Sequence, residues 1–477
     1  MLFNSVQFLI FFPIVGVLYF LINHKYRWVL LLIASCYFYM AFVPVYILIL
    51  GFTIVVDYCA GIFIEKSIGK KRKVFLVASL VANIGVLAFF KYFNFFNGGL
   101  SFLLKGFAVN NPIPYLSIIL PIGLSFHTFQ AMSYTIEVYR GKQLAERNLG
   151  IFALYVMFFP QLVAGPIERP QNLLPQFRVL HRFDYERAAS GLRLMLWGFF
   201  KKIVIADRLA IFVNEIYNHS RNYDSISLIL ATVFFSFQIY CDFSGYSDIA
   251  IGAARVMGFK LMKNFDLPYY SKSISEFWRR WHISLSTWFR DYLYIPLGGN
   301  RTSKLRYYFN LFFIFLVSGL WHGANWTYVV WGSLHGFYMV AEKVVGDVKK
   351  RFFISRNQKV FNSINFFGIV ITFLLTNIAW IFFRANSIND AFLIFKKIIS
   401  FNSSGSSIFS LDKHQLIIAF FSLVILEGVH LVQRHIGISN FLLKSSIFFR
   451  WSVYYAIIIL ILVMGEFRAQ SFIYFQF

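Results

Sequence analysis

Charged side chains are scarce in this sequence. Asp, Glu, Lys and Arg make up 14% of its 477 residues, whereas 58% of the residues are hydrophobic and 21% are aromatic. A typical soluble globular domain carries about 25% charged residues, so a water-facing surface of the usual kind is excluded. Lipid replaces water around much of a polytopic membrane protein. The composition therefore predicts an all-α polytopic membrane protein, which we expect to form a single integral-membrane domain over residues 1–477.

Cysteine is also rare. The three present are Cys36, Cys59 and Cys241, each in or beside an apolar run and none at a metal-binding spacing from another cysteine or a histidine. A disulfide framework and a zinc site are therefore not expected. We predict no bound metal and no resident cofactor.

Acidic residues are outnumbered by basic ones. The chain has 21 Asp and Glu against 45 Lys and Arg, which gives a net charge of +24. Such an excess can indicate a nucleic-acid partner, but here the basic residues lie between apolar runs and form no nucleic-acid-binding motif. Lys/Arg-rich cytoplasmic loops of a membrane protein explain the charge more simply. Attraction to anionic lipid or to an acidic partner is a second contribution.

Long apolar runs, in contrast, are abundant. About 11–13 of them are candidate transmembrane helices, because crossing the apolar core of a bilayer takes about 20 residues. The candidates are residues 3–22, 28–43, 44–62, 74–92, 116–136, 149–165, 189–206, 225–240, 307–322, 324–341, 361–383, 415–432 and 450–466. Several are short or contain a polar residue, which is typical of re-entrant or interfacial helices.

The loops between the first candidates indicate an orientation. Residues 24–27 and 65–73 are basic and follow the first and third candidates, whereas residues 42–45 follow the second and are uncharged. Cytoplasmic loops carry the excess of Lys and Arg. We therefore expect the N-terminus outside and the cluster Lys70–Lys73 in the cytoplasm.

Familiar catalytic motifs are absent, since no GxSxG, HExxH, P-loop or GxGxxG pattern occurs. One histidine is conspicuous instead. Residues 307–341 contain no Asp, Glu, Lys or Arg, yet His322 lies near their middle in "SGLWHGANW". An ionisable residue within a membrane segment is often functional, although a neutral histidine in a helix contact is the alternative. Gly319 and Gly323 permit close backbone approach or a helix break, which favours a pocket around His322.

A second histidine, His335, follows in the same apolar run. In one continuous helix it would lie about 20 Å from His322, at about 1.5 Å per residue, and on another face. We therefore predict that His335 is structural.

Residues 275–301, "SEFWRRWHISLSTWFRDYLYIPLGGNR", are rich in aromatic and basic side chains. Their apolar residues recur at helical spacing and predict one amphipathic helix, begun by Ser273 or Ser275 and ended before Pro296. The apolar stripe comprises Phe277, Trp281, Leu285, Trp288 and Tyr292. An anchor at the membrane interface is the simplest interpretation of such a helix. However, an anchor needs no imidazole, and His282 lies close to the stripe.

Two acidic residues lie near the end of the candidate span 225–240. They are Asp242 and Asp248, in "CDFSGYSDIAIG". Buried acids can carry protons or cations in a transporter. Hydrogen-bonded turn or cap residues are the simpler interpretation.

The C-terminal stretch "SFIYFQF", residues 471–477, is unusually aromatic. Packing against the helical bundle or the membrane interface explains it adequately. The alternative is that Tyr474 is inserted toward an active site.

Five stretches, in this order, resemble the membrane-bound O-acyltransferase family. They are "PQLVAGPIERPQNLLPQF" (160–177), "CDFSGYSDIAIG" (241–252), "EFWRRWHISLSTWFRDYLYIPLGGNR" (276–301), "SGLWHGANWTYVVWGSLHG" (318–336) and "WIFFRA" (380–385). The most similar branch is the bacterial one that acts in alginate O-acetylation and teichoic acid D-alanylation. The resemblance covers nearly the whole chain and is strongest in a motif core from about residue 120 to 390.

The resemblance implies a ring-like bundle of transmembrane, interfacial and re-entrant helices in the bacterial cytoplasmic (inner) membrane. A tunnel through its thin centre would link a cytoplasmic donor to an extracytoplasmic acceptor. The invariant histidine of the family corresponds to His322, the expected general base or proton shuttle. The second histidine of this branch corresponds to His282, which would orient the donor or stabilise the carbonyl oxygen.

Further site residues follow from the same resemblance. "FIYF" (472–475) is similar to the Phe-x-Tyr-Phe end of a small partner protein in the D-alanylation system, which makes Tyr474 a candidate acyl relay. The residues expected to support the pocket are Asn325, Trp321, Arg279, Arg280 and Asp242.

The expected reaction is transfer of an acyl group, acetyl by preference, to hydroxyls of an exported cell-surface polysaccharide. The expected partners are membrane lipid, acetyl-CoA as donor, the polysaccharide, and a periplasmic acyltransferase of the SGNH type (AlgJ–AlgX-like), with no nucleic acid. One alternative is D-alanyl transfer to teichoic acid. The other is a proton-coupled acyl or polysaccharide transporter that uses Asp242, Asp248 and His322.

Overall fold

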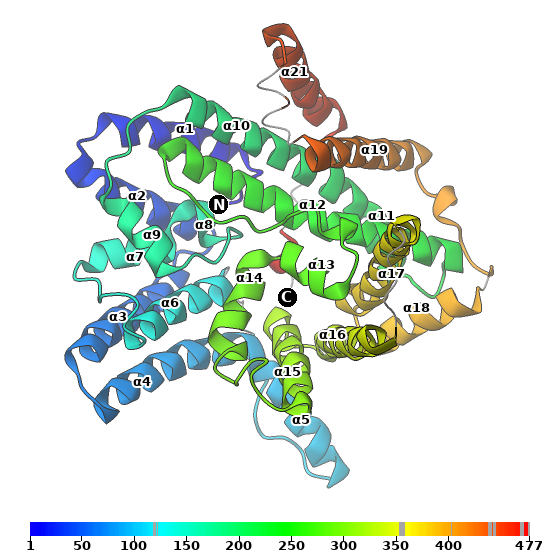
Figure 1. Ribbon diagram of the computed structural model, residues 1–477, viewed down its shortest axis with the longest axis horizontal. Helices are drawn as coiled ribbons and strands as arrows, with labels where there is room; N and C mark the ends of the chain where they lie inside the picture. Colours follow the sequence, from blue (N-terminus) through cyan, green and yellow to red (C-terminus); the bar gives the residue numbers. More distant parts are fainter. Residues whose placement is uncertain are drawn as a thin grey trace. The chain divides into compact units, whose positions relative to one another are not determined.

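Most of the chain is helical in the part that the computed structural model describes (Figure 1). The described residues are 1–117, 121, 123–352, 358–401, 403–436, 441, 445–467 and 472–475. Within these ranges the β pairing is limited to one isolated bridge, between Tyr223 and Ser406. The predicted fold class, an all-α polytopic membrane protein, is confirmed.

In the described chain, 6 helices are long and apolar enough to cross a membrane. They are Tyr46–Lys66, Lys70–Gly106, Ser225–Met257, Phe366–Arg384, Lys413–His435 and Ile447–Met464. Most of the other candidate spans also fall on helical residues, but 149–165 is broken at Phe158 into two helices. Of candidate 116–136, the helix covers Leu124 onward, and residues 118–120 and 122 lie outside the described residues. How many helices cross the bilayer stays a prediction.

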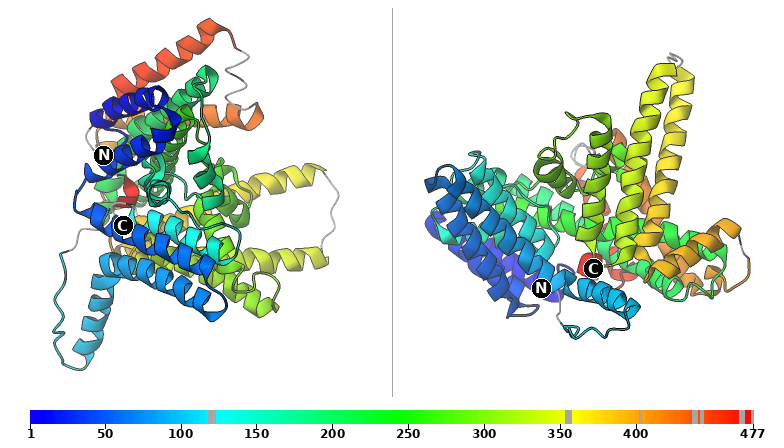
Figure 2. Two further views of the ribbon diagram at one scale, coloured as in Figure 1. Left: turned by 90° about the vertical axis from the view of Figure 1, so that its left-hand side faces the viewer. Right: turned by 90° about the horizontal axis from the view of Figure 1, so that it is seen from below.

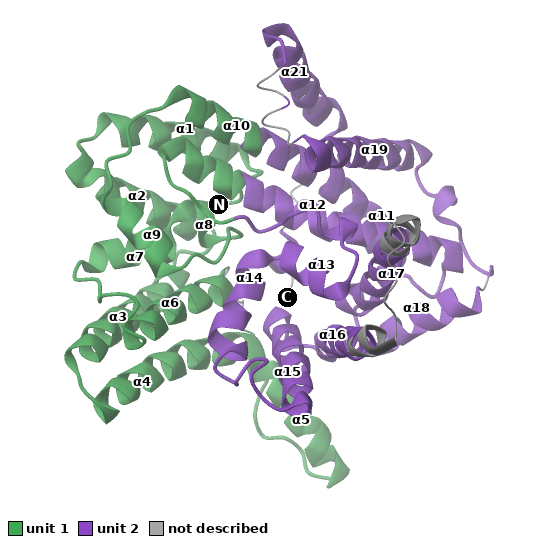
Figure 3. Ribbon diagram, in the orientation of Figure 1, with its two compact units in different colours: residues 1–194, 249–262 green, residues 195–248, 263–477 purple. Residues whose placement is uncertain are grey.

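The chain divides into two compact units (Figure 3). Unit 1 comprises residues 1–194 and 249–262, and unit 2 comprises residues 195–248 and 263–477. Helices α10 (Tyr185–Phe199) and α12 (Ser225–Met257) contribute residues to both.

Unit 1 contains the N-terminal helices. They are α1 (Val6–Leu21), α2 (His24–Met40), α3 (Tyr46–Lys66), α4 (Lys70–Leu87), η1 (Ala88–Tyr92), α5 (Phe93–Gly106), α6 (Leu124–Tyr139), α7 (Leu149–Met157), α8 (Phe159–Leu162), α9 (Pro170–Leu173) and η2 (Leu174–Arg178). Helices α3, α4 and α6 lie side by side (Figure 2). The Asp57 carboxylate of α3 accepts from Ser79 Oγ at 2.6 Å and Asn83 Nδ2 at 2.9 Å, both on α4. A buried acid is therefore solvated by its neighbours.

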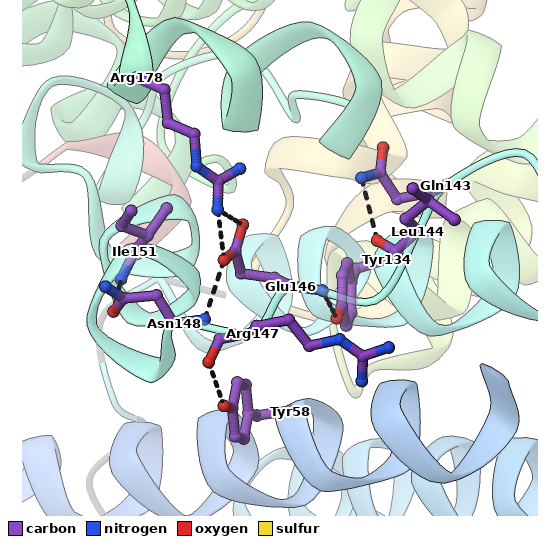
Figure 4. A network of polar contacts seen from close by, with 9 residues as sticks. All are labelled: Tyr58, Tyr134, Gln143, Leu144, Glu146, Arg147, Asn148, Ile151 and Arg178. Carbon is purple, nitrogen blue, oxygen red and sulfur yellow. Dashed lines mark hydrogen bonds and ion pairs between the residues drawn. The ribbon is translucent and has the colours of Figure 1, made fainter. Parts of the chain in front are cut away.

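The segment that joins α6 to α7, residues 140–148, is held by polar contacts (Figure 4). The backbone N–H of Glu146 donates to the Tyr134 hydroxyl at 2.8 Å, and the Glu146 carboxylate accepts from the backbone N–H of Asn148 at 2.9 Å. The same carboxylate pairs with Arg178 at 2.5 Å. These contacts fix the loop at one end of unit 1.

The predicted cytoplasmic segment 65–73 meets this loop. Arg147 pairs with Glu65, and Arg72 donates to the carbonyl oxygen of Tyr139 at 2.8 Å. Two basic segments thus share one end of unit 1, which is the arrangement that cytoplasmic loops require. The side of the membrane on which they lie stays a prediction.

Unit 2 contains the remaining helices. They are η3 (Phe200–Ala206), α11 (Asp207–Asn218), η4 (Pro268–Tyr270), α13 (Ile274–Arg280), α14 (Ile283–Phe289), η5 (Arg290–Tyr294), α15 (Lys304–His322), α16 (Trp326–Phe352), α17 (Gln358–Arg384), α18 (Ile388–Ser400), η6 (Ile408–Ser410), α19 (Lys413–His435), α21 (Ile447–Met464) and η7 (Ile473–Phe475).

Helices α15 and α16 pack closely as an antiparallel pair. A Cβ atom at Gly319 would lie 2.3 Å from the carbonyl oxygen of Tyr328, so only glycine permits this approach. Helix α15 ends at His322, and α16 begins at Trp326 after a turn that contains Gly323. The close approach and the break expected from the glycines are both confirmed.

The continuous helix assumed for His335 is therefore wrong. Because the chain turns back after His322, both histidine rings contact Trp331, with ring centroids 4.9 and 5.0 Å away. The structural role predicted for His335 agrees with its environment, since the Trp278 indole N–H donates to His335 Nδ1 at 3.2 Å.

The single helix predicted over residues 275–301 is also wrong. The structure has two short helices, α13 and α14, that are separated at His282, whose φ of 42° lies in the left-handed region. The predicted cap is present, because Ser273 Oγ accepts from the backbone N–H of Glu276 at 3.2 Å.

The interfacial anchor is wrong for a related reason. The stripe residues Phe277, Trp281 and Leu285 are each only 1% exposed, so they pack inside unit 2 and do not meet lipid headgroups. The Trp281 ring contacts the Trp380 ring of α17 at a centroid distance of 5.3 Å. Their apolar character serves burial within the protein.

Candidate active site

Three of the predicted site residues come together in unit 2. The His322 and Tyr474 ring centroids are 5.5 Å apart, and those of His282 and Tyr474 are 6.4 Å apart. Trp321 contacts both histidines, with centroid distances of 4.9 and 6.2 Å. These residues belong to a helix end, a helix break and the C-terminal segment, which are far apart in the sequence.

His322 is the last residue of α15, and aromatic rings surround it. Besides Trp321, they belong to Trp331 and Phe383, with centroids 4.9 and 5.4 Å from the imidazole. The residue is 4% exposed. The imidazole is thus enclosed by aromatic rings and shielded from water.

His282 occupies the break between α13 and α14 and is fully buried. Its Nδ1 lies 3.2 Å from Oδ1 of Asn264, and the Phe243 ring meets its imidazole at a centroid distance of 4.6 Å. Burial lowers the pKa of the His282 imidazole well below its ordinary value. His282 is therefore neutral across the physiological pH range.

Tyr474 lies in the short helix η7 near the C-terminus. Its ring packs on Phe243 and Phe472, with centroid distances of 4.7 and 5.5 Å. Burial raises the pKa of the Tyr474 phenol above its ordinary value. The phenol therefore stays protonated unless a base removes its proton.

A buried ionic cluster holds this C-terminal segment. The Asp242 carboxylate of α12 accepts from the backbone N–H of Ile473 at 2.7 Å and pairs with Lys202 at 2.6 Å. Lys202 also pairs with Asp207 at 2.7 Å. The residue next to Tyr474 is thus bound to a charged group, and such hydrogen bonds are stronger than neutral ones.

Asp242 and Asp248 are not turn or cap residues, so that interpretation is wrong. Both lie within α12, and Asp248 pairs with Lys201 at 2.8 Å. Neither Lys201 nor Lys202 was predicted from the sequence as part of the site. The sequence does contain an indication of them, because Lys201 and Lys202 are adjacent within the apolar candidate span 189–206. Each buried charge in such a span needs a partner of opposite charge.

The other predicted pocket residues lie in different surroundings. Arg280 pairs with Glu276 at 2.7 Å, and Arg279 is exposed. The Oδ1 of Asn325 accepts from the backbone N–H of Thr327 at 3.1 Å, so Asn325 caps α16. Of the five residues expected to support the pocket, the structure brings Trp321 and Asp242 to the histidines and Tyr474.

No metal-binding cluster appears in the described part of the chain, where no group of three or more His, Cys, Asp or Glu side chains is placed to hold an ion. The arrangement instead offers two buried imidazoles and a phenol. These groups can exchange protons with a hydroxyl or thiol reactant.

Comparisons with known proteins identify a family and several relatives. The model of the MBOAT, membrane-bound O-acyltransferase, family matches residues 148–383, which include both histidines. The "Probable alginate O-acetylase AlgI" of Pseudomonas aeruginosa is 40% identical over 438 residues, which cover 89% of this chain and 82% of that protein.

Two further relatives differ in how much of the chain they match. The "Peptidoglycan O-acetyltransferase" of Helicobacter pylori is 34% identical over 446 residues, which cover 87% of this chain and 82% of that protein. The "Teichoic acid D-alanyltransferase" of Streptococcus thermophilus is 30% identical over 243 residues, which cover 46% of this chain and 56% of that protein. The similarity to the protein named for D-alanyl transfer is thus confined to about half of the chain.

Replacing Asp242 by Ala is expected to free the C-terminal segment, because the N–H of Ile473 loses its charged acceptor. Such a bond contributes about 1.5–3 kcal/mol, so we expect alkylation of a Tyr474→Cys thiol to accelerate about 10- to 100-fold. The measurement uses protein whose three native cysteines are replaced. Asp242→Asn keeps an acceptor oxygen and is expected to retain slow labelling.

The matched control is Asp248→Ala, which removes an acid of the same helix that pairs with Lys201. Its labelling is expected to stay slow. Equal labelling rates in correctly inserted Asp242→Ala and Asp248→Ala proteins would show that Asp242 does not anchor the segment.

Proposed function

Because this chain belongs to the membrane-bound O-acyltransferase family, we propose that it transfers an acetyl group from cytoplasmic acetyl-CoA across the membrane toward hydroxyls of an exported cell-surface polysaccharide. The observation that carries the proposal is the meeting of His282, His322 and Tyr474 within unit 2. The relatives that match most of the chain are named for O-acetylation of alginate and of peptidoglycan, two polysaccharides or polysaccharide-containing polymers.

The first requirement of the reaction is a base, because a hydroxyl is a weak nucleophile at neutral pH. We assign this role to His322. Its imidazole takes the hydroxyl proton as the oxygen bonds to the acyl carbon, and the carbon–sulfur bond of the thioester then breaks. The leaving sulfur takes the proton from His322, which returns to its neutral form.

Tyr474 supplies a hydroxyl inside the site. In the relay version of the proposal its phenol oxygen is the first acceptor, and CoA leaves as the thiol. A hydroxyl of the polysaccharide, or of an SGNH-type partner on the periplasmic side, then takes the acetyl group while the phenol regains a proton. The packing of Tyr474 between the histidines and Phe243 supports this version.

The donor site lies on the cytoplasmic side in this proposal. The phosphates of acetyl-CoA would be attracted to Lys and Arg side chains of the basic segments 65–73 and 140–148 at the end of unit 1. The localisation that follows is the cytoplasmic (inner) membrane of a bacterium.

Two alternatives are less well supported. D-alanyl transfer is disfavoured because the D-alanyltransferase of Streptococcus thermophilus matches only 46% of this chain. A proton-coupled transporter that uses Asp242 and Asp248 is disfavoured because both acids already pair with buried lysines. Such pairs lower the availability of a carboxylate for protons or cations.

Replacing His322 by Ala is expected to reduce acetyl transfer by about 10²–10⁴-fold, the usual contribution of a general base. The measurement is the incorporation of labelled acetyl into cell-surface glycan, with polymer export followed in parallel. Export is expected to continue, whereas a transporter would lose export. His335→Gln is the control, since Gln still offers an acceptor to the Trp278 indole, and it is expected to keep most of the activity.

Replacing Tyr474 by Phe separates the relay from simple packing, because Phe keeps the ring and removes the nucleophile. The relay predicts that transfer to the polymer is lost and that wild-type protein carries an acetyl ester on Tyr474, which peptide mass spectrometry can detect. Normal transfer by Tyr474→Phe protein would exclude the relay and leave the role of His322 intact.

A further inference from the structure

The environment of His282 defines which of its ring nitrogens carries a proton. Its Nδ1 faces Oδ1 of Asn264 at 3.2 Å. Two other groups meet the same Asn264 atom, the backbone N–H of Ser284 at 3.3 Å and the Ser284 hydroxyl at 2.9 Å. A backbone N–H can only donate, so the Asn264 atom is the amide oxygen and not the nitrogen.

The other end of the amide agrees with this orientation. Asn264 Nδ2 donates to the Ser247 hydroxyl at 3.3 Å. Because Oδ1 is an acceptor, the His282 Nδ1 that faces it must be the donor. The neutral imidazole then has its proton on Nδ1 and its lone pair on Nε2.

Asn264 also stabilises the backbone immediately after His282. His282 has a φ of 42°, which is costly for a residue with a Cβ atom. The backbone N–H of Ile283 donates to the Asn264 carbonyl oxygen at 2.9 Å, and the backbone N–H of Ser284 donates to Asn264 Oδ1 at 3.3 Å. One residue thus stabilises both the unusual turn and the orientation of the imidazole. Asn264 itself is 1% exposed, so water does not compete for its amide.

We propose that Asn264 is a positioning residue that fixes His282 in the tautomer protonated at Nδ1, so that His282 acts through Nε2 as a hydrogen-bond and proton acceptor. This inference rests on the proposed function for the identity of the reaction, but the tautomer follows from geometry alone. It reverses one expected role of His282, because a neutral Nε2 without a proton cannot donate to the carbonyl oxygen of the acyl donor. His282 instead accepts from, and orients, the hydroxyl or thiol group of a reactant.

The tautomer can be tested without any assay of acyl transfer. Protein labelled with ¹⁵N-histidine in a lipid or detergent environment gives distinct ¹⁵N shifts for protonated and lone-pair nitrogens, and comparison with His282→Gln protein assigns the signals. The expected result is a protonated Nδ1 and a lone-pair Nε2 in wild-type protein. A proton on Nε2 would overturn the inference, whether or not the protein transfers acetyl groups.

Two variants test the functional consequence. Asn264→Asp keeps an acceptor and adds a charge beside Nδ1–H, so the pKa of His282 should rise by about 1–3 units. His282 is then protonated at a higher pH, and Nε2 stops being an acceptor at that pH. The pH at which kcat falls on the acidic side of its profile should therefore rise. Asn264→Leu removes the acceptor, and kcat should fall with KM for acetyl-CoA little changed.

The outcomes separate a positioning role from a purely structural one. The inference would be contradicted if both variants failed to fold and if any remaining activity of the Asn264→Asp protein kept the wild-type acidic limb of its kcat–pH profile. The inference would be supported if Asn264→Asp protein retained activity that Asn264→Leu protein lost, and if the acidic limb of the Asn264→Asp kcat–pH profile moved to a higher pH. Failure of the proposed function would appear differently, as the absence of acetyl transfer by wild-type protein that has the expected tautomer.

Discussion

A helix that ends inside an apolar protein must find hydrogen-bond partners for its terminal backbone groups, and both site histidines lie at such an end. At His282 the partners come from Asn264, whose carbonyl and amide oxygens accept from the next two residues. At His322 the chain turns through Gly323, and Asn325 caps the following helix. The need to satisfy this backbone explains why Asn264 is buried beside His282 and why Asn325 follows the apolar helix that ends at His322.

The same helix ends bring separate parts of the sequence to one place. The break between α13 and α14 places the buried His282 imidazole against Phe243 of α12, and the end of α15 places His322 against Trp331 of α16. The C-terminal segment completes the group through the bond of Ile473 to Asp242. A buried ion pair contributes little net stability, so the pair of Lys202 with Asp242 is better understood as a means of fixing geometry.

The fold class and part of the site could be predicted from the sequence. Composition alone defines the membrane protein, and the glycines beside His322 correctly indicate a break and a close helix contact. These features are local, since they depend on residue types within a few positions of one another. The family resemblance added His282 and Tyr474, which local patterns left undecided.

The predictions from the sequence that were wrong concern contacts between residues far apart in the chain. The apolar spacing over residues 275–301 is that of a helix, and nothing local indicates that Asn264, 18 residues before His282, stabilises a left-handed residue there. The pairing of Lys202 with Asp242 is likewise invisible to periodicity. Arg279 and Arg280 were expected near the pocket because of their position in a motif, whereas the short helix α13 turns Arg280 toward Glu276.

The central claim is that the two helix-end histidines act together in one acyl-transfer site. The most direct test compares acetyl transfer by His282→Ala, His322→Ala and the double variant, in vesicles supplied with labelled acetyl-CoA and with insertion of each protein verified. Residues that act as a unit have strongly non-additive effects. We predict that the double variant is no slower than the slower single variant. Multiplicative losses, or normal transfer by either single variant, would contradict the claim.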